Sequence, residues 1–241
     1  TTQFYIDAKN YWIERNTLNT LNSGTDVAET AIEAHRSMGT VRDNVINGFR
    51  NGVLIVPGFF AEEYDSTLIS ISNNKFYNIL SGVTLWQISV RDLANVNITD
   101  NSFEIDPSRF ENPQNSYGVC TLDALPNDNG NKKITNVSIQ NNIIKFLPFD
   151  AVYSDPDFTQ NFCGIKLFSY VSIKNIKITN NQIIDAPSIG IFVGARGDAS
   201  YPNKADGIDV TNNTIINAGK NINISSVGYN PRTPIRVNGN A

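Results

Sequence analysis

A short phrase that recurs along the chain constrains its fold more than any other feature. The phrase has two apolar residues separated by one residue, then two further residues, then an asparagine. The clear copies are ISISNNKF (69–76), VNITDNSF (96–103), VSIQNNII (137–144), IKITNNQI (176–183) and IDVTNNTI (208–215). Weaker copies occupy 11–18 and 39–46, and a truncated copy occupies 235–240. The shared column consists of Asn16, Asn44, Asn74, Asn101, Asn142, Asn181, Asn213 and Asn240.

The spacing of these copies indicates stacked β-strand coils. Apolar residues two positions apart follow the period of a β-strand, in which one face is buried and the other faces solvent. The shared asparagines are separated by 28, 30, 27, 41, 39, 32 and 27 residues. A leucine-rich repeat needs leucine-defined positions every 20 to 29 residues or so, and a propeller blade needs about 40 to 45 residues with four strands. A coil of about 27 residues with two or three short strands fits better, and longer separations indicate inserted loops.

A second strand is expected after each asparagine, and it opens with a small residue in most coils. These strands are AIEAHR (31–36), GVLIVP (52–57), GVTLWQ (82–87), GVCTLD (118–123), GIKLFS (164–169), GIFVGA (190–195) and NINISS (221–226). Their inward positions form an aliphatic column of Ile32, Val53, Val83, Val119, Ile165, Ile191 and Ile222. The sequence therefore predicts an all-β fold, a single-stranded parallel β-helix of about eight coils that forms one domain over residues 1–241.

We assign the asparagine column to the turns between strands. A sharp turn needs a residue that tolerates the left-handed backbone conformation and forms local hydrogen bonds, and asparagine does both. Stacked amides can also pair from coil to coil. None of the eight asparagines is therefore a candidate site residue.

The composition of the chain indicates which classes of binding partner are not expected. The chain carries 19 basic and 23 acidic residues, a net charge of -4, so we expect no nucleic acid partner. No apolar run approaches the roughly 20 residues that span a bilayer, so we expect no membrane insertion. Cys120 and Cys163 lie three positions apart in the predicted register, roughly 10 Å along a strand and too far for a disulfide. We expect free thiols, no metal centre and no cofactor.

The repeat, with its asparagine turns and aliphatic columns, resembles the pectin-lyase-like parallel β-helix superfamily, and within it the tailspike depolymerases of bacteriophages. The resemblance implies a right-handed coil, a bacterial surface polysaccharide bound along an outer face, a homotrimer, and a location in a virion tail or outside the cell. The Gly-His-Gly triplet of polygalacturonases is missing, and PRTPIR (231–236) is one residue short of the pectate lyase motif. Because the chain stops inside the eighth copy of the phrase, we expect a portion of a longer tailspike-like chain.

Loops inserted into the coils are the expected location of chemistry. Glycoside hydrolysis uses two carboxyl groups, about 5 to 5.5 Å apart for retention and about 6.5 to 9.5 Å apart for inversion, and these gaps match one or two steps between coils. Asp123 is the leading candidate, because it ends a strand in the middle of the stack with Lys166 projecting from the next coil. The candidate catalytic residues are Asp123, Asp155, Asp157, Glu62 and Glu63. The candidate substrate-binding residues are Trp86, Phe168, Lys166 and Arg196.

A column of outward-facing residues follows the second strand, and we call it the outward strip. Its members are His35, Val56, Trp86, Leu122, Phe168, Gly194 and Ser225. Contiguous exposed apolar surface usually marks an interface. The two aromatic side chains could stack on sugar rings, or the strip could contact other subunits of a trimer. The subunit contact is favoured, since sugar platforms rarely need Val and Leu beside them.

Glu33 and His35 alternate on the same outer face and have the composition of an acid–base pair. Their place near one end of the stack favours a surface or capping role instead.

Three functions remain open. The first is a tailspike-like depolymerase that cleaves a bacterial surface polysaccharide, by hydrolysis in preference to elimination. The second is a receptor-recognising β-helix or adhesin that binds glycan without cleaving it. The third is a polysaccharide lyase or epimerase on the same fold.

Overall fold

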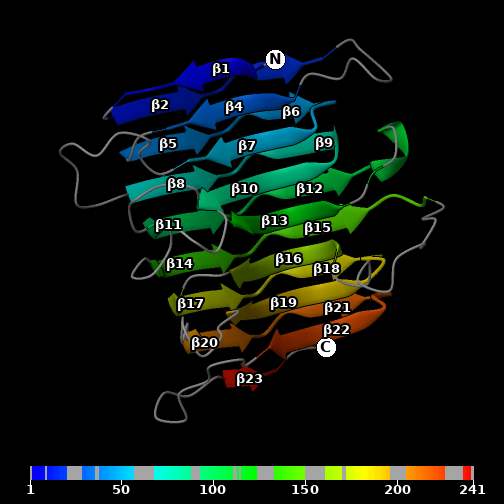
Figure 1. Cartoon of the computed structure of the whole chain (residues 1–241). Helices are drawn as coiled ribbons and strands as arrows, with labels where there is room; N and C mark the ends of the chain where they lie inside the picture. Colours follow the sequence, from blue (N-terminus) through cyan, green and yellow to red (C-terminus); the bar gives the residue numbers. More distant parts are fainter. Residues whose placement is uncertain are drawn as a thin grey trace.

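The structure is a computed structural model that describes residues 2–8, 10–20, 29–35, 38–56, 68–87, 93–110, 113, 115–123, 133–149, 161–169, 172–195, 205–225 and 236–239. These residues form a stack of short strands that runs from the N-terminal end at the top of Figure 1 to the C-terminal end at the bottom. Strands of successive coils pair in parallel and build three sheets, of eight, eight and seven strands. The predicted all-β parallel β-helix is therefore confirmed.

We name the sheets A, B and C in the order in which the chain visits them. Sheet A contains β1 (Thr2–Ile6), β4 (Thr30–Ala34), β7 (Asn51–Ile55), β10 (Ser81–Gln87), β13 (Ser116–Asp123), β16 (Phe162–Ser169), β19 (Ile189–Ala195) and β22 (Lys220–Ser225). Sheet B contains β2 (Asn10–Glu14), β5 (Met38–Arg42), β8 (Leu68–Ser72), β11 (Leu93–Thr99), β14 (Lys133–Gln140), β17 (Ser172–Thr179), β20 (Ala205–Thr211) and β23 (Arg236–Asn238). Sheet C contains β3 (Thr17–Asn19), β6 (Val45–Asn47), β9 (Lys75–Ile79), β12 (Ser102–Ile105), β15 (Ile143–Phe146), β18 (Gln182–Ile184) and β21 (Thr214–Ile216).

The recurring phrase forms the strands of sheet B, and the predicted second strands form sheet A. The predicted inward column of sheet A is confirmed by the pairing of Val53 with Val83 and of Val83 with Val119. Sheet C supplies a third strand in each coil, and each of its strands begins directly after an asparagine of the shared column. Strand β1 precedes the first phrase and was not predicted; it pairs with β4.

Inward side chains of the three sheets fill the centre of the stack. In sheet C the inward column is Leu18, Ile46, Phe76, Phe103, Ile144, Ile183 and Ile215, all of them buried. The rings of Phe76 and Phe103 stack with their centroids 4.6 Å apart. Burial of one Val, Leu, Ile or Phe side chain contributes about 1.5–3 kcal/mol. The apolar columns of the sequence therefore account for the core.

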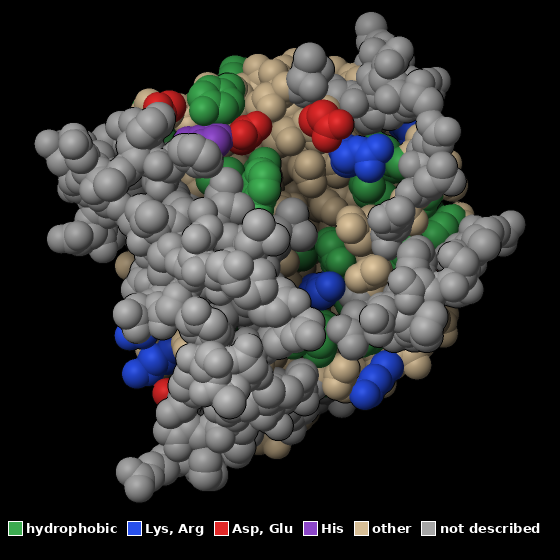
Figure 2. Space-filling view, in the orientation of Figure 1, with side chains coloured by type: hydrophobic (Ala, Val, Ile, Leu, Met, Phe, Trp, Pro, Cys, Tyr) green, Lys and Arg blue, Asp and Glu red, His purple; other side chains and the backbone are tan. Residues whose placement is uncertain are grey.

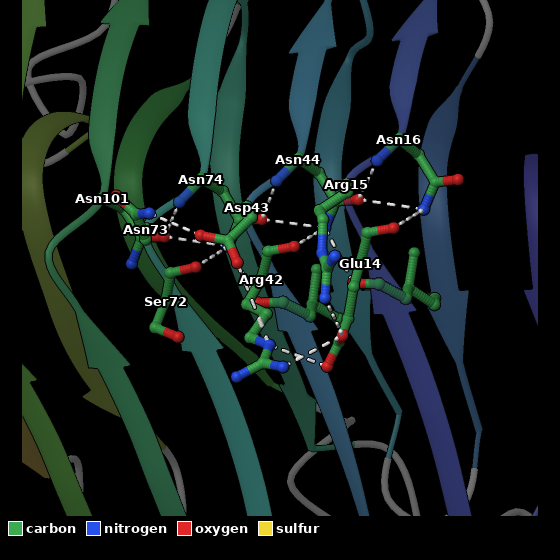
Figure 3. A network of polar contacts seen from close by, with 12 residues as sticks. Glu14, Arg15, Asn16, Arg42, Asp43, Asn44, Ser72, Asn73, Asn74 and Asn101 are labelled. Carbon is green, nitrogen blue, oxygen red and sulfur yellow. Dashed lines mark hydrogen bonds and ion pairs between the residues drawn. The ribbon is translucent and has the colours of Figure 1, made fainter.

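The asparagine column forms a hydrogen-bonded ladder at the corner between sheets B and C (Figure 3). In each step, the backbone N–H and the side-chain Nδ2 of one asparagine donate to Oδ1 of the asparagine in the next coil. From Asn44 to Asn74 these distances are 3.0 Å and 2.9 Å. The same bonds join every successive pair from Asn16 to Asn213. The expected pairing of stacked amides is confirmed for these members, and Asn240 lies outside the described residues.

The left-handed residue of each turn is the one before the ladder asparagine, which corrects the expectation that the asparagine itself adopts this conformation. Residues at that preceding position have φ between 54° and 58°: Arg15, Asp43, Asn73, Asp100, Asn141, Asn180 and Asn212. Within the described residues, no ladder asparagine has a positive φ. Two neighbouring residues therefore have separate roles in the turn. The residue before the ladder asparagine bends the backbone, and the ladder asparagine donates hydrogen bonds to the next coil.

Glycine near the start of the sheet A strands, next to the corner with sheet C, allows neighbouring coils to approach closely. The column consists of Gly52, Gly82, Gly118, Gly164 and Gly190. A Cβ atom on Gly82 would lie 2.3 Å from Cδ1 of Phe103 and 2.4 Å from the carbonyl oxygen of Gly118. The small residues that open the predicted strands are therefore required by the packing of the core.

The described residues contain a single short 3₁₀ turn, η1 (Pro107–Arg109), and no α-helix. Accordingly, none of the helical structure in the described part of the chain is long and apolar enough to cross a membrane.

Candidate functional site

The candidate site is the outer face of sheet A, where outward side chains of β10, β13, β16 and β19 lie next to one another. Val83 and Val119 belong to the core, whereas Thr84 and Cys120 lie on the opposite side of the sheet, where both are buried, with the hydroxyl of Thr84 3.6 Å from the Cys120 sulfur. Figure 2 shows this side of the molecule with a hollow in which hydrophobic and basic side chains are visible. The histidine and several acidic side chains lie toward the upper end of the same view.

The outward strip forms one column, as predicted, but its described side chains are not freely exposed. Trp86 pairs with Leu122, and Phe168 pairs with Gly194. Val56 is 1% exposed, and the two aromatic side chains are half-buried. The exposed large hydrophobic side chains of the described residues are Phe4, Tyr5, Trp12, Leu68, Tyr77, Ile143 and Ile216. Val56 is therefore buried and not open to a partner, whereas Trp86 and Phe168 keep part of their surface open, and the subunit contact stays a prediction.

Trp86 and Phe168 are the large aromatic side chains of the outward strip. They lie on β10 and β16, two strand spacings or roughly 10 Å apart. The ring of Phe168 stacks on that of Phe192, with centroids 4.9 Å apart and 15° between the ring planes. Because Phe192 is buried and Phe168 is only half-buried, Phe168 has a fixed neighbour and a partly open surface. Such a ring offers a flat apolar contact to a ligand.

Lys166 projects from the coil next to that of Asp123, as predicted, and its ammonium group is directed toward Tyr117. On its own face it lies between Cys120 of β13 and Phe192 of β19. Its Nζ donates a hydrogen bond of 3.3 Å to the hydroxyl of Tyr117 and lies 5.2 Å from the centre of that ring. Cys120, the partner of Lys166 in the register, is three positions before Asp123, or roughly 10 Å along the strand.

A second, smaller hydrophobic cluster lies on this face outside the main core, and we call it the satellite cluster. Its members are Tyr117, Cys120, Cys163, Ile189 and Phe192, all buried, with Phe168 packed against them. Burial raises the pKa of Cys163 to about 12, and the nearby charge of Lys166 opposes this effect only in part. Burial also raises the pKa of Tyr117 well above its ordinary value. Both groups are therefore neutral at physiological pH.

The two cysteines are free thiols, as predicted. Cys163 pairs with Tyr117 and Cys120 pairs with Lys166, so the thiols lie three positions apart on neighbouring strands. Reactive cysteines are partly exposed and easily ionised, whereas these two are buried. They therefore act as packing residues of the satellite cluster.

Asp123 is the one candidate catalytic acid that falls within the described residues. It ends β13, as predicted, and its backbone pairs with Gln87. The other candidate residues lie outside the described part of the chain, and their roles stay predictions: Glu62, Glu63, Asp155, Asp157 and Arg196. Among the residues that the structure describes, no three His, Cys, Asp or Glu side chains group closely enough to hold a metal ion.

Comparisons with known proteins do not assign this chain to a family. A scan against models of protein families finds no match, and searches of curated proteins and of solved structures find no similar chain. The fold assignment therefore rests on the pairing and burial of the strands. The relation to tailspike depolymerases stays a prediction.

At the N-terminal end of the same face, Glu33 and His35 contact each other directly. Nε2 of His35 lies 2.6 Å from Oε1 of Glu33, and the hydroxyl of Thr2 donates to Oε2 at 2.8 Å. The ring of Tyr5 lies 4.7 Å from that of His35. Because β1 supplies two of these contacts, the pair ties the first strand of sheet A to the second. This arrangement is consistent with the expected capping role.

Tyr117 is the residue of this face that the sequence did not single out. It directly precedes Gly118, where the predicted strand begins, but the strand β13 already includes it. The signal lies in the register, since the position before the corner glycine is Tyr117, Cys163 and Ile189 on three successive strands. An apolar column at a corner thus extends the outer face beyond the strand that was predicted.

Proposed function

We propose that the chain binds a bacterial surface polysaccharide along the outer face of sheet A and cleaves it by glycoside hydrolysis, as tailspike depolymerases do. The observation that carries this proposal is the presence of Trp86, Phe168 and Lys166 on one face of the sheet. Ligand sites combine aromatic walls with a few placed polar groups, and sites on strands keep their geometry better than sites on loops. These three side chains supply both kinds of contact from regular strands.

Hydrolysis requires two carboxyl groups beside the bound glycan. One carboxylic acid donates its proton to the glycosidic oxygen as the bond from that oxygen to the anomeric carbon breaks. In the inverting route, a carboxylate takes a proton from water, and the water oxygen bonds to the anomeric carbon. We assign one role to Asp123, at the end of β13, and the other to an acid from the set Asp155, Asp157, Glu62 and Glu63.

Glycan binding without cleavage is the second candidate, and one observation favours it. Among the described side chains on the strands of sheet A, the acid on the outer face is Glu33. Both of its carboxylate oxygens are already engaged, one by Thr2 and the other by His35. A face without an available carboxyl pair would bind a glycan but would not hydrolyse it.

The proposal includes a homotrimer and an extracellular or virion-tail location. Trp86 and Phe168 are half-buried, so part of the outward strip stays open to either a glycan or a second subunit. Sedimentation equilibrium tests the trimer, which should have three times the 26.6 kDa of the chain. A single species with the mass of one chain at high concentration would contradict this part.

Cleavage is tested by incubating the protein with capsular and cell-wall polysaccharides from a panel of bacteria. Hydrolysis should release new reducing ends, elimination should give an unsaturated product that absorbs ultraviolet light, and binding alone should give neither. A polysaccharide that binds without yielding any product would contradict cleavage and support the second candidate.

Binding is tested through tryptophan fluorescence. The chain has two tryptophans, so Trp12→Phe leaves Trp86 as the only emitter, and a bound glycan should change its emission. Phe168→Leu should weaken binding by about tenfold, the effect of losing roughly 1.4 kcal/mol at an aromatic contact. Trp12→Ala is the matched control, because Trp12 is 71% exposed on the outer face of sheet B. Equal losses for Trp12→Ala and Trp86→Ala would contradict this location.

A further inference from the structure

Lys166 differs from the other described lysines in its burial. Lys75, Lys133, Lys145, Lys174, Lys177 and Lys220 are all exposed, whereas Lys166 is half-buried. Lysine side chains normally keep the ammonium group in water while the methylene groups cover apolar surface. A half-buried lysine on an outer face therefore calls for a specific explanation.

The charge of Lys166 has no anionic partner within the described part of the chain. The ion pairs there involve Arg15, Arg42 and His35, and Lys166 is not among them. The chain is nevertheless acidic overall, with a net charge of -4, so acidic residues are not scarce. Burial of an ammonium group without a counter-charge is costly.

Among the residues that the structure describes, the immediate neighbours of Lys166 are neutral. Cys120 and Phe192 flank it in the register, and the hydroxyl of Tyr117 accepts its hydrogen bond. Because burial raises the pKa of Tyr117, this hydroxyl does not become a phenolate counter-ion. The ammonium group has three N–H donors, and one of them is used by Tyr117. Within the described part of the chain, the remaining donors and the charge of Lys166 are thus available to an anion.

We propose that Lys166 binds an anionic group of the glycan, a carboxylate or a phosphate, and that the ligand of this face is therefore an acidic polysaccharide. This inference rests on the proposed function and adds the substrate class. Lys166 and Phe168 lie two positions apart on β16 and point to the same side, about 7 Å apart along the strand. One charged sugar can thus contact the ammonium group and an aromatic ring together.

The test compares an acidic polymer with its neutral form. The probes are glucuronate-containing capsular polysaccharides, the same polymers after reduction of their carboxyl groups to alcohols, and a phosphate-containing teichoic acid. Calorimetry should show that the wild type binds one of the two acidic polymer classes at least about tenfold more tightly than the reduced polymer. The class that binds identifies the anion as carboxylate or phosphate.

Variants assign this preference to Lys166. Lys166→Gln should lose about tenfold or more in affinity for the acidic polymer and keep its affinity for the reduced one. Lys166→Arg keeps the charge and should retain the preference, and it serves as the test if Lys166→Gln does not fold. Lys145→Gln is the matched control, because it removes an exposed charge from sheet C. Added salt should weaken acidic binding by the wild type more than by Lys166→Gln.

The outcomes separate this inference from the proposed function. A wild type that binds neutral polymers as tightly as acidic ones, or a Lys166→Gln variant that loses both equally, overturns the acidic class and leaves polysaccharide binding in place. A wild type that binds no polymer overturns both.

Discussion

Asn74 donates two hydrogen bonds to a single atom of Asn101, since its backbone N and its Nδ2 lie 2.9 Å and 3.0 Å from the Asn101 Oδ1. The Nδ2 of Asn101 donates in turn to the carbonyl oxygen of Ile71 at 2.9 Å and to Oδ1 of Asn142 at 3.0 Å. Asn101 is 1% exposed. One buried amide therefore joins three consecutive coils.

Asn101→Ala is expected to lower the free energy of unfolding by about 3 kcal/mol or more. The substitution removes the acceptor of the buried Asn74 backbone N–H and the side-chain donor to the carbonyl oxygen of Ile71, at about 1–3 kcal/mol each, and leaves a cavity in the buried ladder. The Oδ1 of Asn142 keeps its hydrogen bond from the backbone N–H of residue 101. Urea unfolding followed by circular dichroism measures the change. Asn97→Ala is the control, because Asn97 is exposed in the same coil and should change stability by less than about 0.5 kcal/mol. Equal effects would mean that the ladder does not stabilise the stack.

The position before a ladder asparagine is expected to accept glycine and reject valine. Asn141 is exposed and has a φ of 56°. Asn141→Gly should be neutral or stabilising, while Asn141→Val should cost about 1–2 kcal/mol, because a branched side chain clashes in the left-handed conformation. Thermal unfolding compares the two variants. Ile143→Val, on a nearby exposed strand position, should change little, and a loss there as large as in Asn141→Val would point to another cause.

Gly82→Ala is expected to destabilise the fold by at least about 2 kcal/mol, since the added Cβ overlaps packed atoms. It would meet the ring of Phe103 and the backbone oxygen of Gly118. Combining it with Phe103→Leu removes the first contact only, so the double variant should recover part of the loss. Soluble yield and melting temperature measure both variants. A fully stable Gly82→Ala would show that the corner is less tightly packed than described.

Stability is expected to fall as pH rises from 9 toward 12. Burial raises the pKa of Cys163 from 9.0 to about 12, so the unfolded chain loses this proton in a range where the folded chain keeps it. The stabilisation is complete below the unfolded pKa and is lost as pH approaches the folded pKa. Burial of Tyr11 and Tyr117 adds the same effect above pH 10.

Denaturant unfolding between pH 9 and pH 10 isolates the thiol. There Cys163→Ala should reduce the slope by up to about 1.4 kcal/mol per pH unit, the value for one proton. An unchanged slope would show that another group titrates in this window.

The fold was predictable because its two strongest signals are local and repeated. Ile69 and Ile71 show the strand period within one phrase, and Asn74 marks where the strand ends. Sheet C was harder to predict, since strands of three to five residues such as β18 are too short to show a period. The left-handed position was misassigned because Asn73 and Asn74 are the same residue type, and their backbone angles do not follow from composition.

The candidate site was predictable only where the register determines it. Trp86 and Phe168 share a column because strand pairing fixes which residues face outward. Their burial did not follow from the column, since exposure depends on whatever else covers a face. The contact of Lys166 with Tyr117 depends on the bend at Gly118, which extends the face by one column. The acidic loop residues were proposed as catalytic only from their residue type and their position in inserted loops. The repeat does not determine the backbone path of an inserted loop.

The ladder bonds connect asparagines that are between 27 and 41 residues apart in the chain, yet every donor–acceptor distance lies between 2.9 Å and 3.1 Å. The geometry of the asparagine ladder thus does not depend on the number of residues inserted between two coils. Insertions can lengthen, shorten or be replaced without altering the spacing of the residues beneath them. A protein built this way can change its inserted loops quickly in evolution while its scaffold stays constant, and the same property makes it a candidate for grafting new loops by design.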